Sequence, residues 1–126
     1  MPLLIDTDVL IDYLRDRPEA VAYLESLTDN LLISAITVAE LYAGVREGGE
    51  RDALDSFVRA FEIVNANEQI AVKGGLYRRD YSKSHNTGLA DALIGATAEL
   101  RHAELVTLNR KHFPMLSDVV VPYQKP

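Results

Sequence analysis

The stretch LLIDTDVLIDYL, residues 3–14, changes its character after its third residue. The continuous apolar run at its start predicts a short buried strand. From Val9 onward the apolar residues recur at helical spacing, so we expect a helix with Thr7 or Asp8 as its N-cap. Asp6 stands directly after the strand. In an α/β fold the carboxyl end of a strand is where functional sites form, so Asp6 is the first candidate site residue.

The rest of the chain continues this alternation of short apolar runs with helices. Gly74-Gly75 weakens one helical pattern, and KSHNTG at residues 83–88 predicts a polar loop. Such alternation indicates a parallel sheet covered by helices on both faces. We predict a single α/β domain over residues 1–126, a three-layer α/β/α sandwich with a short, about five-stranded, mainly parallel sheet. Strands are expected at residues 3–5, 31–34, 62–65, 104–108 and 118–123, and further helices at 18–27, 35–45, 51–61, 68–82 and 89–101, with a short turn or helix at 110–116.

The composition fits a folded domain without disulfides. The chain has 126 residues, 48% of them hydrophobic, and no cysteine, so a cysteine-ligated zinc site is excluded. The sequence has no signal-peptide pattern and no membrane-length apolar run, and we expect a cytoplasmic protein with no membrane partner. The net charge of −6 argues against non-specific binding of nucleic acid, although a clustered acidic site accounts for part of the acidic excess.

Glu40 is the only acid in the apolar stretch ISAITVAELYAGV. An ionised carboxylate is costly to bury unless it is paired, which favours a functional role. The structural alternative is a capping box, because Thr37-x-x-Glu40 has the required spacing. Ser34 is an equally good cap for the same helix, directly after the strand.

Asp91 is likewise the only acid at the start of an apolar helix, in TGLADALIGATAEL. Asn86 or Thr87 can cap this helix and would place Asp91 in its first turn, where acids also occur for dipole reasons. The other early acids have simpler explanations: we expect Asp8 to cap a helix and Asp12 to be solvated.

Three carboxylates brought together from separate elements would repel one another. Two charges about 4 Å apart cost on the order of 4 kcal/mol at an effective dielectric constant near 20. A divalent cation removes this cost, and an all-oxygen ligand set suits Mg²⁺ or Mn²⁺. Such a cation can activate water and stabilise charge on a phosphodiester.

The segment LVTLNRKHF ends a predicted strand on polar residues. Thr107 and Asn109 either make turn contacts or orient a water or a phosphate at the sheet edge. His112 is either a ligand, a phosphate contact or a surface residue, and we expect the surface.

Four segments in order, LLIDTDVLIDYL, SAITVAELYAG, GLADALIGATA and LVTLNRKHF, resemble the PIN-domain family, and more narrowly its VapC-type toxins. The resemblance implies a Mg²⁺- or Mn²⁺-dependent endoribonuclease on a five-stranded parallel α/β/α sandwich. It also implies a homodimer, an RNA substrate, and a cognate antitoxin protein whose C-terminal segment blocks the active-site groove.

Mapped by motif, the resemblance implies an acidic site of Asp6, Glu40 and Asp91. Asp6 and Asp91 would hold the metal, and Glu40 would bind or orient a metal-bound water or accept its proton. Asn109 would orient that water. Asp8 stands where family members often carry Asn.

The remaining assignments are supporting ones. Thr7, Asp8 and Thr107 are expected to support the site, and Arg46, Arg110 and Lys111 to hold RNA phosphates at its rim. Many family members have a fourth acid near the last motif, often at the position of His112, and this chain lacks it.

Two other functions stay open. LLIDTDVL also resembles the signature of haloacid-dehalogenase-type phosphatases, in which Asp6 would be a nucleophile and Asp8 an acid/base. Those enzymes usually exceed this length and need a late acidic pair, which the chain lacks. The second alternative is a catalytically degenerate PIN module that only binds partners.

Overall fold

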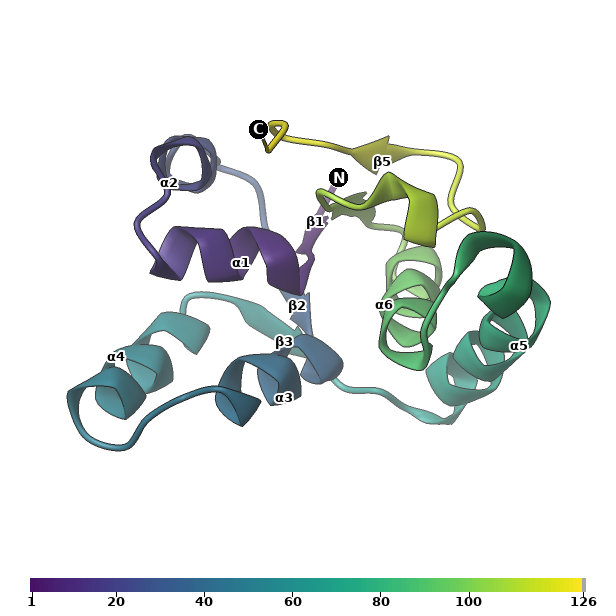
Figure 1. The fold of residues 1–126 in the computed structure, drawn as a ribbon, viewed down its shortest axis with the longest axis horizontal. Helices are drawn as coiled ribbons and strands as arrows, with labels where there is room; N and C mark the ends of the chain where they lie inside the picture. Colours follow the sequence, from purple (N-terminus) through teal and green to yellow (C-terminus); the bar gives the residue numbers. More distant parts are fainter. Residues whose placement is uncertain (126) are drawn as a thin grey trace.

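A parallel sheet forms the middle layer of the molecule (Figure 1). The computed structural model describes residues 1–125. The sheet has five strands in the order β3-β2-β1-β4-β5, and every neighbouring pair is parallel. This confirms the predicted α/β class and the five-stranded sheet. The strands are β1 (Leu3–Ile5), β2 (Leu31–Ser34), β3 (Glu62–Val64), β4 (Glu104–Val106) and β5 (Val119–Val120).

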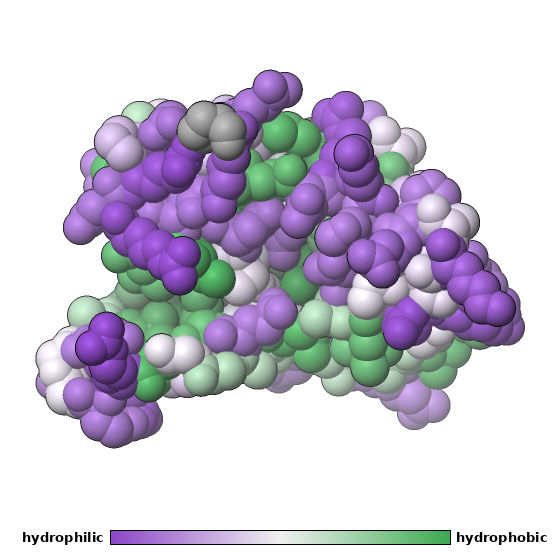
Figure 2. Space-filling view, viewed as in Figure 1, coloured by the Kyte–Doolittle hydropathy of each residue, from purple (hydrophilic) through white to green (hydrophobic). Residues whose placement is uncertain are grey.

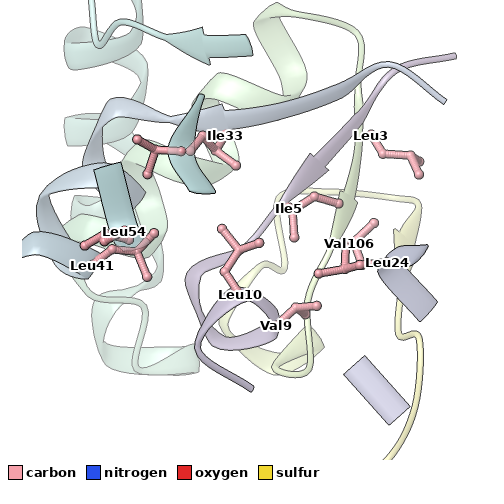
Figure 3. Close-up of a cluster of buried hydrophobic side chains, with 10 residues drawn as sticks. Leu3, Ile5, Val9, Leu10, Leu24, Ile33, Leu41, Leu54 and Val106 are labelled. Atoms are coloured by element: carbon pink, nitrogen blue, oxygen red, sulfur yellow. The ribbon is translucent and has the colours of Figure 1, made fainter. Parts of the chain in front are cut away.

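Helices cover both faces of the sheet (Figure 1). Leu3 and Ile5 of β1 point to one face and join the cluster of Val9, Leu10 and other side chains drawn in Figure 3. Leu4 points to the other face and packs in the cluster under the last two long helices. Within residues 1–125, no helix is both long enough and apolar enough to cross a membrane. The helices are α1 (Thr7–Leu14), α2 (Pro18–Glu25), α3 (Ala35–Ala43), α4 (Gly49–Val58), α5 (Glu68–His85), α6 (Leu89–Leu100) and the 3₁₀ turn η1 (Arg110–His112).

The order of the strands places a switch point between β1 and β4. From β1 the chain proceeds to β2 on one side of the sheet, and after β3 it crosses to β4 on the other side. Ile5 lies beside Val106 in the register, so the residues after them, Asp6 and Thr107, emerge side by side. Ligands of open parallel sheets bind in this kind of crevice.

Three predicted helix boundaries need correction. Asp6, not Thr7 or Asp8, is the N-cap of α1, and its carboxylate accepts a hydrogen bond from the Thr7 amide. The N-cap of α6 is Gly88, because the preceding Asn86 has a left-handed backbone (φ 53°) that ends α5. As α5 extends to His85, the predicted polar loop is shorter than residues 83–88.

Gly74 does not interrupt α5, because the close approach of α6 requires a glycine there. A Cβ atom at Gly74 would lie 2.6 Å from Cδ2 and 3.1 Å from Cα of Leu93. Gly75 has open space around it. The glycine pair that weakened the helix prediction is therefore, at Gly74, a packing device between two helices.

Candidate active site

Asp6 lies at the floor of the crevice, with its side chain held from both sides. Oδ1 accepts from the Thr7 amide at 2.8 Å, and Oδ2 accepts from the Thr107 hydroxyl at 2.7 Å. The residue is only 5% exposed. Burial, followed by the charge of Asp8 and more weakly that of Asp91, raises the pKa of Asp6 to about 7. Its ionised form lacks a positive partner within the described chain.

Asp8 joins the first turn of α1 to the turn after β4. Its Oδ1 accepts from the Val9 amide at 2.8 Å, and its Oδ2 accepts from the Leu108 amide at 3.0 Å and lies 3.4 Å from the Thr107 hydroxyl. The side chain is half-buried, and burial raises its pKa. The expectation that Asp8 is the helix N-cap is wrong, because Asp6 takes that position.

Asp91 faces the same crevice from the first turn of α6. It is half-buried, and burial raises its pKa despite the nearby His112. Its Oδ2 lies 3.1 Å from Nδ1 of His112. His112 is half-buried against Asp91 and does not lie free at the surface. The Thr87 hydroxyl donates to the His112 carbonyl at 3.0 Å and helps to fix η1 beside the start of α6.

Glu40 approaches from α3 through a threonine contact. The Thr7 hydroxyl lies 2.7 Å from Oε1 of Glu40 and 3.0 Å from the Thr37 hydroxyl. Because a hydroxyl has one proton, Thr7 donates to Glu40 and accepts from Thr37. Glu40 itself is exposed, so its carboxylate does not carry the cost of burial. The capping box is wrong, since Ser34 is the N-cap of α3.

The remaining predicted residues divide into two locations. Asn109 is exposed, and its backbone amide donates to the Thr107 hydroxyl at 3.1 Å, so the residue lies beside the site. Arg110 and Lys111 follow it in η1. Arg46 lies apart from these residues. Its side chain is 89% exposed, and its Nε is 3.6 Å from Oε2 of Glu50.

Two grooves meet at this site. The first, of about 950 Å³, we call the basic groove. The second, of about 500 Å³, lies between α1, α3 and α4 and we call it the apolar groove; Figure 2 shows apolar side chains in the hollow between α1 and α4. Asp8, Arg110, Lys111, Val121, Tyr123 and Lys125 are among the residues lining the basic groove, and Ile11, Leu14, Glu40, Val45, Arg46 and Leu54 among those lining the apolar groove.

The donor chemistry of the site fits a hard divalent cation. In residues 1–125, no three Asp, Glu or His side chains converge closely enough to form a complete metal cage. Mg²⁺, however, usually keeps several waters and takes only one or two protein carboxylates. Burial raises the pKa values of Asp6, Asp8 and Asp91 together, which means that their charges lack compensation. A cation placed among them would supply it.

The fold and the site define a class: an open parallel α/β protein with an acidic, cation-suited centre at its switch point. Residues 3–117 match the family described as PIN domain, and the chain belongs to that family.

Curated relatives cover almost the whole chain. The chain is 39% identical over 127 residues to Ribonuclease VapC10 of Mycobacterium tuberculosis, covering 98% of this chain and 95% of that protein. It is 42% identical over 125 residues to Ribonuclease VapC19 of the same organism, covering 95% and 98%. Among solved structures, a toxin-antitoxin complex from Klebsiella pneumoniae matches with a TM-score of 0.85 at 33% identity, covering 98% of this chain and 99% of that one.

Proposed function

We propose that this chain is a divalent-metal-dependent endoribonuclease and the toxin of a type II toxin–antitoxin pair. Relatives named VapC ribonucleases span nearly all of the chain, which supports the activity. The observation that carries the proposal is the buried carboxylate of Asp6, whose pKa is raised to about 7 beside Asp8 and Asp91. Such a site is built for a positive ligand.

Asp6 and Asp91 would hold the cation, Mg²⁺ or Mn²⁺. When bound, the cation supplies an activated water and stabilises the charge that develops on the scissile phosphate. The chain keeps the ligands in place: Thr107 and the Thr7 amide hold Asp6, and His112 orients Asp91. Asp8 supports the same centre, because its Oδ2 lies 3.4 Å from the Thr107 hydroxyl that holds Asp6.

Glu40 is the proton acceptor for the attacking water. Its carboxylate is exposed to the site and therefore free to take a proton, while Thr7 fixes its Oε1. Thr37 holds Thr7 in turn, so the threonine pair orients Glu40 without removing its charge. Asn109 would orient the water, and Arg110 and Lys111 would hold neighbouring RNA phosphates.

The apolar groove is the place for the cognate antitoxin. Solved relatives include toxin-antitoxin complexes from several bacteria, which supports such a partner. Leu14, Val45 and Leu54 offer an apolar lining, and Glu40 lies in the same groove. An antitoxin C-terminal segment seated there would cover Glu40 and block the site.

We also infer a homodimer in the cytoplasm. Val72 and Leu76 on α5 are 57% and 43% exposed, and they line one shallow depression with Leu100. An apolar surface of this kind suits a second copy of the chain.

The phosphatase alternative lacks support. Residues 3–117 match the PIN domain instead, and the chain lacks the late acidic pair that such phosphatases need. The degenerate-module alternative predicts a protein that neither binds Mn²⁺ nor cleaves RNA.

Cleavage of structured RNA tests the proposal. Cleavage is expected with Mg²⁺ or Mn²⁺ and should be lost in EDTA and in Asp6→Asn. Asp52→Asn, an equal change at an exposed acid of α4, is the control and should cleave normally. Calorimetric titration with Mn²⁺ should show binding that Asp6→Asn weakens. Full activity in EDTA or in Asp6→Asn overturns the mechanism, and absence of both cleavage and Mn²⁺ binding establishes the degenerate module.

A further inference from the structure

Asp12 ties residues 121–125 to α1. It is 4% exposed, which overturns the expectation of a solvated side chain. Its Oδ2 accepts from the Tyr123 hydroxyl at 2.8 Å, and its Oδ1 pairs with Nζ of Lys125 at 3.0 Å. Arg17 adds a second cationic contact, with its Nε 3.8 Å from Oδ2 of Asp12. Figure 1 shows the chain after β5 running back over the top of the molecule towards α1 and α2.

This tie makes residues 121–125 one wall of the basic groove. Tyr123 and Lys125 lie on that wall, and Arg110 and Lys111 line the groove from η1. Arg110 is itself anchored, since its Nη2 donates to the Val119 carbonyl at 3.1 Å. Asp8 lines the same groove, so the groove opens directly onto the acidic site.

The charge of the basic groove is opposite to that of the protein. The whole chain has a net charge of −6. The groove is lined by the cations Arg110, Lys111 and Lys125 and by the single acid Asp8. The pairing with Asp12 uses only part of the donor capacity of Lys125, whose side chain is 48% exposed.

We propose that the basic groove is a track for the phosphates of a single RNA strand running away from the acidic site, and that Asp12 is the positioning residue that holds its wall. The proposal rests on the ribonuclease function proposed above. Cations along a groove that starts at a phosphodiester-cleaving site follow a nucleic-acid backbone, and Tyr123 and Val121 add surface for a base. The proposed RNA-contacting residues are therefore Arg110, Lys111 and Lys125, and Arg46 is not among them.

Binding without cleavage tests the track. A fluorescein-labelled single-stranded RNA is titrated in EDTA, followed by anisotropy at several salt concentrations. Combined Arg110→Gln, Lys111→Gln and Lys125→Gln should weaken binding at least about tenfold and reduce the slope of log K against log salt by about 2, since each phosphate contact on a single strand contributes roughly 0.7. Arg59→Gln, an exposed arginine that lines neither groove, is the matched control and should bind as wild type. An unchanged slope in the triple variant, or an equal loss in Arg59→Gln, overturns the track.

Two further measurements separate the alternatives. Polyglutamate should compete poorly with the RNA; competition equal to that of RNA of the same length would assign the groove to an acidic polypeptide and overturn the proposal. Wild-type cleavage with Mn²⁺ is measured in parallel. A wild type that fails to cleave refutes the proposed function, whereas normal cleavage with an unchanged binding slope refutes the track alone.

Tyr123→Phe tests the role of Asp12 without changing any charge. It removes one of the contacts that fix the wall, so hydrogen exchange at residues 121–125 should accelerate and RNA affinity in EDTA should fall severalfold. Ile63→Ala on β3, at the opposite edge of the sheet from β5, serves as a control for general loosening. Faster exchange at residues 121–125 with unchanged RNA affinity would show that Asp12 only stabilises the fold and would overturn its positioning role.

Discussion

The basic and apolar grooves flank the same carboxylates but are built from different parts of the chain. Turns and extended segments, with their exposed polar and cationic side chains, line the basic groove. Faces of α1, α3 and α4 line the apolar groove. Asp8 lies in the first and Glu40 in the second. Under the proposed function, RNA and the antitoxin would therefore reach the acidic site through different grooves, using different chemistry.

Glu40→Gln gives the largest expected effect and tests whether the apolar side takes part in catalysis. Glutamine still accepts a hydrogen bond from the Thr7 hydroxyl but cannot take a proton from the attacking water. The value of kcat should therefore fall by about 10²–10⁴-fold with little change in the affinity for RNA. Single-turnover cleavage with Mn²⁺ measures kcat, and Glu47→Gln on the exposed surface is the control. If kcat stays within threefold of wild type, the proton passes elsewhere and Glu40 belongs only to the antitoxin surface.

Asp6, the most buried carboxylate of the site, should couple stability to pH. Its pKa is about 7 in the folded protein and near 3.8 when unfolded, so the folded state binds more protons between these values. In EDTA the stabilisation from protonated Asp6 is complete below pH 3.8, declines as pH rises towards 7, and is absent above it. Above pH 7, Asp6→Asn should therefore raise Tm by several degrees in EDTA, as measured by thermal unfolding. With Mn²⁺ the wild type should have the higher Tm. An unchanged Tm of Asp6→Asn in EDTA would contradict the charge repulsion at Asp6.

Asp12→Asn should weaken the wall of the basic groove and the fold together. The change removes the charge that pairs with Lys125 and Arg17, and we expect a loss of about 1–3 kcal/mol in the free energy of unfolding at pH 7. Hydrogen bonds from Lys125 and Tyr123 lower the pKa of Asp12 in spite of its burial. Its contribution is thus present above the unfolded pKa and lost as pH falls through the folded one. Urea denaturation at pH 7 and pH 3 measures this, and an equal loss at both values would contradict it.

Leu14→Asp gives the smallest expected change and acts on the apolar groove alone. Leu14 is 41% exposed, so the substitution should barely alter stability. It places a charge on the surface proposed for the antitoxin and should weaken that complex by about tenfold, in line with the 1–3 kcal/mol of one apolar side chain. RNA binding in EDTA should not change. Isothermal titration with the antitoxin measures the first quantity, and equal effects on antitoxin and RNA would mean that the two grooves are not separate.

Local patterns in the sequence were enough for the sheet and for the origin of the main carboxylates. The apolar run before Asp6 predicts a strand that ends there, and the apolar helix around Asp91 predicts that this acid lies in its first turn. Both carboxylates could therefore be placed at the carboxyl edge of the sheet. The parallel sheet with its two helical layers followed from the same alternation.

Contacts between distant segments were not readable in this way. Asp12 looks solvated beside its own neighbours, and only Tyr123 and Lys125, more than a hundred residues later, explain its burial. The contact of His112 with Asp91 also joins two separate segments, so the residues around either one do not reveal it. Glu40 has apolar neighbours in the sequence, yet its side chain is exposed on α3.

The place of β1 in the sheet also sets the moment at which the acidic site can form. β1 lies between β2 and β4, and Thr107, which holds Asp6, comes directly after β4. While a ribosome is still making the chain, Oδ2 of Asp6 therefore lacks its contact with the Thr107 hydroxyl until the segment around residue 107 has been synthesised. The acidic site is thus assembled only when nearly all of the chain is present.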